Sequence, residues 1–178
     1  MGTELVQLVV GSDRKILSVH KKLLCSVSEF FDKALNGRFA EASSNQMELP
    51  EDTPSIVSMF ISWLYTRDLK FDLYECDTSL GVTTLIDLYV FADAKRCNAL
   101  KNKAMDTLQD GLYSCHLVLD LYQVEFVFEK TCTNDESPIR CFLVEAIAHR
   151  LHEGLWEVED VSNLFRSHPE VLSDYLRL

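Results

Sequence analysis

The stretch Val19-His20-Lys21-Lys22-Leu23-Leu24-Cys25-Ser26-Val27-Ser28-Glu29-Phe30-Phe31 (residues 19–31) marks the point where the chain changes from a strand pattern to a helix pattern. Before it, residues 5–10 and 15–19 are short strand-like runs separated by a turn-like segment, which is typical of a β-hairpin. Within and after it, apolar side chains recur at helical spacing, and Ser28 can cap a second helix that ends near Gly37. This order predicts a β-hairpin followed by two short helices.

The chain downstream of this stretch shows a third strand and a further helix. Residues 46–49 alternate between polar and apolar side chains and are closed by a proline, which predicts a strand ahead of a turn. Thr53-Pro54 is typical of a helix start, with threonine as the cap and proline at the first helical position. Residues 69–71 could form a brief strand, and the polar segment 72–81 indicates an irregular surface loop.

From Val82 onwards the sequence is helical in character. A strongly apolar helix begins there, and an amphipathic helix covers about residues 98–112. The expected C-terminal helices are residues 116–130, 138–153, 158–166 and 169–178. Because no proline-, glycine- or serine-rich linker separates the parts, we expect an α+β domain over residues 1–112 and a helical C-terminal extension over residues 113–178 packed on it.

Composition restricts the classes of partner. The chain has 178 residues, of which 47% are hydrophobic, and this length is enough to bury roughly two-thirds of the unfolded surface without disulfides. Its 17 Lys and Arg residues stand against 28 Asp and Glu residues, which gives a formal net charge of -11. Such a surface repels polyphosphate, so nucleic acid and anionic membrane are not expected as partners.

The cysteines and the apolar runs indicate an intracellular protein. The six cysteines are widely and irregularly spaced, which favours reduced thiols over a disulfide framework. The first residues carry no basic leader, and no apolar run approaches the roughly 18 to 20 residues that span a bilayer. We therefore expect the chain in the cytoplasm, the nucleus or both.

Five motifs in this order resemble the BTB/POZ domain, and the resemblance covers about residues 4–112. The matching stretches are VQLVVG (residues 6–11), VHKKLLCSVSEFF (19–31), MELPED (47–52), WLYT (63–66) and LYVFAD (88–93). Each alone is a weak signal, whereas their joint presence is specific. The chain is most similar to the fungal type of this domain, in which LPED, WLYT and an LYVxAD helix recur and further helices follow.

The resemblance implies a docking module and not an enzyme. BTB/POZ domains form dimers, bind transcriptional co-repressors or act as substrate adaptors on the cullin scaffold of a ubiquitin ligase complex. We expect a protein–protein interaction module that serves as such an adaptor. The alternative is a structural or self-association domain of a transcriptional or other regulatory protein. Dimeric members carry an additional strand and helix before the hairpin, and only about four residues precede it here, so we expect a monomer or a weak homodimer.

Residue-level expectations follow from the same resemblance. Cullin-binding members are similar to one another in a hydrophobic-x-acidic motif after the second paired helix, where this chain has Phe39-Ala40-Glu41. Phe39 and Glu41 are therefore the candidate partner-binding residues, with the aromatic ring as anchor and the carboxylate as orienting group. The alternative is that Phe39 packs its loop onto the preceding helix. Co-repressor-binding members pair an acidic residue at the head of the first strand with a basic one. Lys21 is present, but the acidic position falls on Leu5, so we expect the co-repressor pocket to be absent.

We expect no catalytic, cofactor-binding or metal-binding residues. The six glycines are far apart, so neither a nucleophile elbow nor a phosphate-binding loop can form. His149 and His152 stand three residues apart with Glu145 one turn earlier, but zinc usually needs three or four ligands, and surface polar side chains are the better interpretation. His20 is interpreted as structural, with its imidazole bonding the backbone where the second strand meets the first helix.

Overall fold

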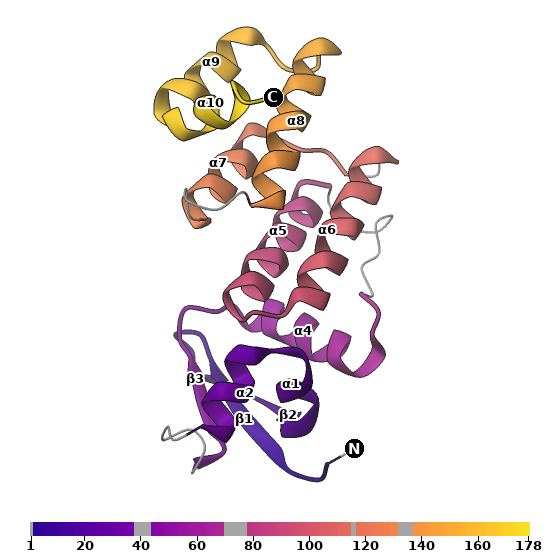
Figure 1. Cartoon of the computed structure of the whole chain (residues 1–178), viewed down its shortest axis with the longest axis vertical. Helices are drawn as coiled ribbons and strands as arrows, with labels where there is room; N and C mark the ends of the chain where they lie inside the picture. Colours follow the sequence, from indigo (N-terminus) through magenta and orange to yellow (C-terminus); the bar gives the residue numbers. More distant parts are fainter. Residues whose placement is uncertain (1, 38–43, 70–77, 115–116, 132–136) are drawn as a thin grey trace. The chain divides into compact units, whose positions relative to one another are not determined.

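The computed structural model describes residues 2–37, 44–69, 78–114, 117–131 and 137–178 (Figure 1). The chain divides into two compact units, Met1–Leu117 and Val118–Leu178, and each is described by itself. Within the described ranges the fold is α+β, with a small mixed sheet and nine helices. The expected fold class is therefore confirmed, whereas the packing of the C-terminal extension on the first domain stays a prediction.

The sheet of the first unit has the strand order β2-β1-β3. β1 (Leu5–Val10) and β2 (Lys15–His20) form an antiparallel hairpin, and β3 (Gln46–Leu49) pairs with β1 in parallel. The three predicted strands are confirmed, β2 being one residue longer than expected. Gly11 opens the hairpin turn with φ of +72°, a conformation that glycine adopts without steric cost.

Alternation in β1 determines which face of the sheet is buried. Val6, Leu8 and Val10 are fully buried and Val9 is 5% exposed, whereas Leu5 and Gln7 are exposed. Because successive side chains of a strand point to opposite faces, the even-numbered residues of β1 face the core, and at Val9 the other face is covered as well.

The two short helices after the hairpin are α1 (Lys21–Val27) and α2 (Glu29–Asn36), as predicted. Ser28 separates them: its Oγ accepts from the Phe31 backbone N–H at 3.2 Å and donates to the Lys95 carbonyl at 2.5 Å. Ser28 is buried, so one hydroxyl both caps α2 and fixes it to a segment 67 residues away. Gly37 ends α2 where the sequence places its stop.

Three further helices complete the first unit: α4 (Pro54–Thr66), α5 (Thr78–Ala94) and α6 (Asn98–Tyr113). Proline opens α4 as expected, and α5 and α6 pack along each other (Figure 1). Four aromatic rings from α2, α4 and α5 meet in the core: Phe31, Phe60, Trp63 and Phe91. The apolar residues that recur at helical spacing in the sequence therefore supply the side chains of this core.

The expected surface loop over residues 72–81 is wrong at its C-terminal end. Residues 78–81 form the first turn of α5, and Gly81 is buried within it. The weak helix propensity of this glycine indicated a loop, but tertiary packing overrides propensity. The remainder of the loop, and residues 70 and 71 of the candidate strand, lie outside the described residues.

The second unit is built from α7 (Leu121–Lys130), α8 (Pro138–His152), α9 (Val158–Ser167) and α10 (Pro169–Tyr175). Its helical character is confirmed. The expected start of the first helix near residue 116 is wrong, because residues 117–120 are not helical and alternate in burial. The Gln123 Oε1 accepts from the Asp120 N–H at 2.6 Å, which begins α7 at Leu121.

A buried arginine joins the helices of this second unit. Arg140 on α8 is 2% exposed, and its guanidinium donates to the Phe128 carbonyl at 2.9 Å and to the Thr131 carbonyl at 2.6 Å. Its Nε donates to the Thr131 Oγ1 at 2.7 Å, and the group lies 4.4 Å from the centroid of the Phe128 ring. Asp174 on α10 stands 4.0 Å away. Arg140 thereby satisfies the Phe128 and Thr131 carbonyls at the C-terminal end of α7.

Candidate functional site

The predicted partner-binding residues Phe39 and Glu41 lie outside the described residues, in the segment between α2 and β3. The structure therefore does not test them. It describes the preceding helix up to Gly37 and the chain again from Ser44. What it adds is the surface on which this segment begins, because Asn36 at the end of α2 lines a hollow.

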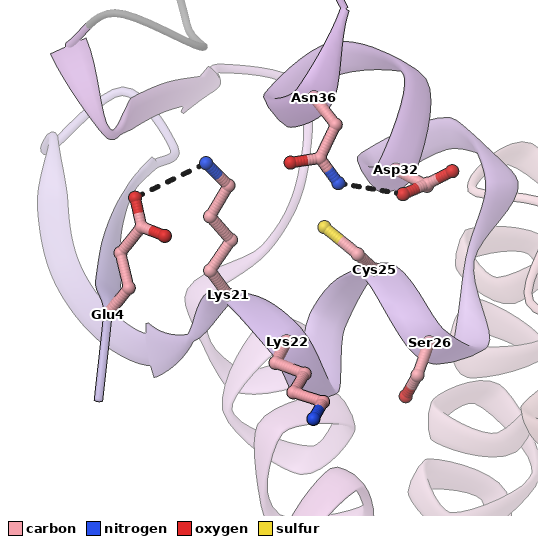
Figure 2. A pocket seen from close by; sticks show the side chains of 7 residues that line it. All are labelled: Glu4, Lys21, Lys22, Cys25, Ser26, Asp32 and Asn36. Atoms are coloured by element: carbon pink, nitrogen blue, oxygen red, sulfur yellow. Dashed lines mark hydrogen bonds and ion pairs between the residues drawn. The ribbon is translucent and has the colours of Figure 1, made fainter. Parts of the chain in front are cut away.

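This hollow lies between the start of the hairpin and the first two helices, and has a volume of about 400 Å³ (Figure 2). It is lined by Glu4, Lys21, Lys22, Cys25, Ser26, Asp32 and Asn36. The lining is polar and mostly exposed. A small ligand usually needs a more enclosed and more apolar cavity, so the hollow is better suited to side chains of another protein.

An ion pair forms one side of the hollow. Glu4 Oε1 lies 3.3 Å from Lys21 Nζ, and the Lys21 N–H donates to the Glu4 carbonyl at 3.0 Å. The antiparallel register explains this, because Leu5 faces His20 and the preceding pair is therefore Glu4 and Lys21. Our assignment of the acidic position to Leu5 is thus wrong by one residue. The pair itself contributes at most about 1 kcal/mol, since the Glu4 side chain is 54% exposed.

The opposite side of the hollow carries an acid, an amide and a thiol. The Asn36 Nδ2 donates to the Asp32 Oδ1 at 2.8 Å, and the Cys25 sulfur points toward them (Figure 2). Burial, and after it the nearby Asp32 carboxylate, raises the pKa of the Cys25 thiol. A thiol with a raised pKa is a poor nucleophile at neutral pH. The hollow thus offers both signs of charge for recognition and no activated group for chemistry.

His20 has a different partner from the expected backbone group. Its Nδ1 lies 2.6 Å from the Tyr65 hydroxyl, and its backbone N–H donates to the same oxygen at 3.3 Å. Tyr65 comes from α4, 45 residues further along the chain. The structural role assigned to His20 therefore depends on a tertiary contact that local sequence reasoning could not reveal.

The described residues show little that would support metal or thiol chemistry. No group of three or more His, Cys, Asp or Glu side chains among them could hold a metal ion. His149 and His152 are both exposed on α8. Cys25, Cys97 and Cys141 are free, and burial raises the pKa of the Cys97 thiol as well. Across the same ranges, no helix is both long and apolar enough to cross a membrane.

Comparison with protein-family models matches residues 4–112 to the BTB/POZ domain. The chain belongs to the BTB/POZ domain family. BTB domains are protein–protein interaction modules that bind other proteins and self-associate, and they are in general not enzymes. The matched range covers the hairpin, the paired helices, β3 and helices α4 to α6. The hollow therefore lies within the BTB domain.

One similar solved structure is the BTB (Tramtrack and Bric a brac) domain of human Gigaxonin. It shares 19% sequence identity with this BTB domain, with a TM-score of 0.45, and the match covers 58% of this chain and 75% of that chain. No curated protein sequence matches the chain.

Proposed function

We propose that this BTB domain is a substrate adaptor that docks on a cullin-type ubiquitin ligase scaffold, with Phe39 and Glu41 as contact residues. The observation that carries the proposal is the position of Phe39-Ala40-Glu41 immediately after α2 in a BTB domain. α2 is held in place by the two hydrogen bonds of Ser28 and ends at Asn36, with Gly37 as its C-cap. The motif therefore follows a helix that hydrogen bonds hold in place.

The chemistry of the motif suits an interface anchor. A phenylalanine supplies a large apolar area at low cost in side-chain entropy, and residues of this kind dominate binding energy at protein interfaces. A neighbouring carboxylate adds orientation and a preference for a basic partner surface. This function needs recognition only, so the proposal assigns the chain no catalytic residue and no cofactor.

Replacement of Phe39 by alanine is the first test. We expect a loss of about 2 kcal/mol or more of binding free energy, roughly thirtyfold in affinity, with the melting temperature nearly unchanged. The measurement is titration of a purified cullin N-terminal region, with melting followed by circular dichroism. Tyr113→Ala is the matched control, because Tyr113 is a 93% exposed aromatic on α6 and its loss should not change cullin binding.

Two results would count against the adaptor function. If Phe39→Ala lowers the free energy of unfolding by about 3 kcal/mol or more, Phe39 is a core residue and not an anchor. If the unaltered protein binds no cullin, the adaptor role is lost and the general docking role remains.

A second candidate is the domain of a transcriptional regulator, and the Glu4–Lys21 pair favours it. Co-repressor-binding members resemble one another in such an acidic and basic pair, and the structure contains one where the sequence alone had not indicated it. Lys21→Ala would weaken a co-repressor interaction and leave cullin binding intact, so the two candidates are separable. The assembly state, expected to be a monomer or a weak homodimer, stays a prediction.

A further inference from the structure

β2 is the outer strand of the sheet. The strand order is β2-β1-β3, so β2 has a paired strand on one side only among the described residues (Figure 1). The free side is accessible: Lys15 and Ser18 are exposed, and Ile16 is 60% exposed. An accessible strand edge is a template for pairing with another extended chain.

The hydrogen bonds of β1 show which of its peptide groups face which neighbour. The Gln7 N–H donates to the Asn45 carbonyl at 2.9 Å, and the Gly11 N–H donates to the Leu49 carbonyl at 3.0 Å. Odd-numbered residues of this strand therefore direct their backbone groups toward β3. Because direction alternates along a strand, the even-numbered residues direct theirs toward β2.

The register then assigns the outward groups of β2. Each even-numbered residue of β1 faces an odd-numbered residue of β2. The backbone N–H and C=O groups of the even-numbered residues of β2 therefore point away from β1. These are Ile16, Ser18 and His20. The His20 N–H agrees with this assignment, because it donates to the Tyr65 hydroxyl and not to β1. Ile16 and Ser18 are left to present their N–H and C=O groups along the free edge.

The charge along this edge is opposite to that of the whole chain. Residues 14–22 carry four Lys and Arg side chains and no acidic one, in a chain of formal net charge -11. Lys15 and Lys22 form no ion pair within the part of the chain that the structure describes. The edge therefore combines backbone groups that have no partner among the described residues with positive charge at both ends.

We propose that the β2 edge binds an extended acidic segment of another protein, which adds to the sheet as a fourth strand. Backbone pairing along Ile16 and Ser18 would supply the register, and carboxylates of the segment would face Lys15 and Lys22. A second copy of this chain is a poor occupant, because pairing of two β2 edges would bring Lys15 and Lys22 of both copies together, whereas Arg14 and Lys21 are paired with Glu48 and Glu4. The proposal does not depend on Phe39 or Glu41.

The test uses the full chain and a fluorescein-labelled synthetic peptide of alternating glutamate and valine. We expect fluorescence polarisation to show binding that weakens as salt is added, because exposed charges are screened. Hydrogen exchange should show new protection of the Ile16 and Ser18 amides. The comparison peptide has lysine in place of each glutamate and should not bind.

Substitutions at Ser18 separate backbone pairing from charge attraction. Ser18→Pro removes an outward N–H without removing a bond to β1, and should lower affinity about tenfold or more. Ser18→Ala keeps the N–H and should bind like the unaltered protein. Lys15→Glu combined with Lys22→Glu should lower affinity to a similar degree, whereas Lys103→Glu on α6 is the matched charge control.

Several results would overturn the proposal. Failure of the glutamate peptide to bind, equal binding of the lysine peptide, or binding without protection of Ile16 and Ser18 would each do so. A folded Ser18→Pro variant that binds normally would show that no strand is added. If circular dichroism shows that the Ser18→Pro variant does not fold, two other measurements test the proposal. These are the hydrogen exchange of the unaltered protein with the peptide and the affinity of the variant with Lys15→Glu and Lys22→Glu. A tight dimer through β2 would identify a second copy as the occupant instead.

Discussion

Replacing Arg140 by methionine is expected to lower the free energy of unfolding of the second unit by about 3 kcal/mol. The substitution keeps an aliphatic stem but removes the guanidinium, which leaves the Phe128 and Thr131 carbonyls and the Thr131 hydroxyl without this donor. Buried acceptors that lose a charged donor are costly, and the contact of the cation with the Phe128 ring is lost as well. Native-state hydrogen exchange of α7 and α8 amides measures the change.

Two further substitutions are controls for Arg140→Met. Arg177 also pairs with Asp174, at 3.2 Å, but its side chain is 74% exposed, so Arg177→Met should cost less than about 0.5 kcal/mol. Arg140→Lys keeps the charge without the planar guanidinium group and should restore only part of the free energy of unfolding that is lost in Arg140→Met. Equal small effects at Arg140 and Arg177 would show that the buried hydrogen bonds add little to stability.

Replacing Phe60 by alanine is expected to destabilise the first unit by about 3–5 kcal/mol, because a fully buried ring is lost and a cavity remains. The Phe60 ring stands at the centre of the aromatic core, with ring centroids 5.9 Å from Phe31, 5.3 Å from Phe91 and 6.4 Å from Trp63. Loss of Phe60 therefore loosens contacts among α2, α4 and α5 together.

The measurement for Phe60 can be confined to the first unit. The chain has two tryptophans, so a Trp156→Phe background leaves Trp63 as the single tryptophan, whose fluorescence reports urea unfolding. Tyr113→Ala in the same background is the control, because a 93% exposed ring has little burial to lose. A Phe60→Ala midpoint close to that of the control would contradict the central place given to this ring.

The strands and most helix ends could be predicted because local residues determine them. Alternation over residues 5–8 reflects the part of β1 that is buried on one face, and Ser28, Gly37 and Pro54 act within one turn of the helix ends they define. The start of α7 was missed although its signal is local: Asp120 followed by Gln123 ahead of an apolar run is a capping pattern. The start of α5 is different, because burial of Gly81 depends on tertiary packing.

The candidate site was less accessible to sequence reasoning. The hollow combines residues from the head of the hairpin and from two helices, so no single stretch of sequence shows it. The Glu4–Lys21 pair could have been found by counting back from the hairpin turn, since the register follows from the turn length. The contact between His20 and Tyr65 could not, because nothing in either stretch indicates the other.

The parallel pairing of β3 with β1 has a consequence for the order in which the fold is assembled. β1 and β2 are joined by a four-residue connection. Gln7 can pair with Gln46 only after the residues of both paired helices have been synthesised. Closing the longer loop costs more entropy, and synthesis delivers β3 later, so we expect an intermediate with a complete hairpin and an open β1 edge. In pulse-labelled refolding, the Lys21 amide, bonded to Glu4, should become protected before the Gln7 amide, bonded to Asn45. Simultaneous protection would show that, in the complete chain, β3 docks together with the hairpin.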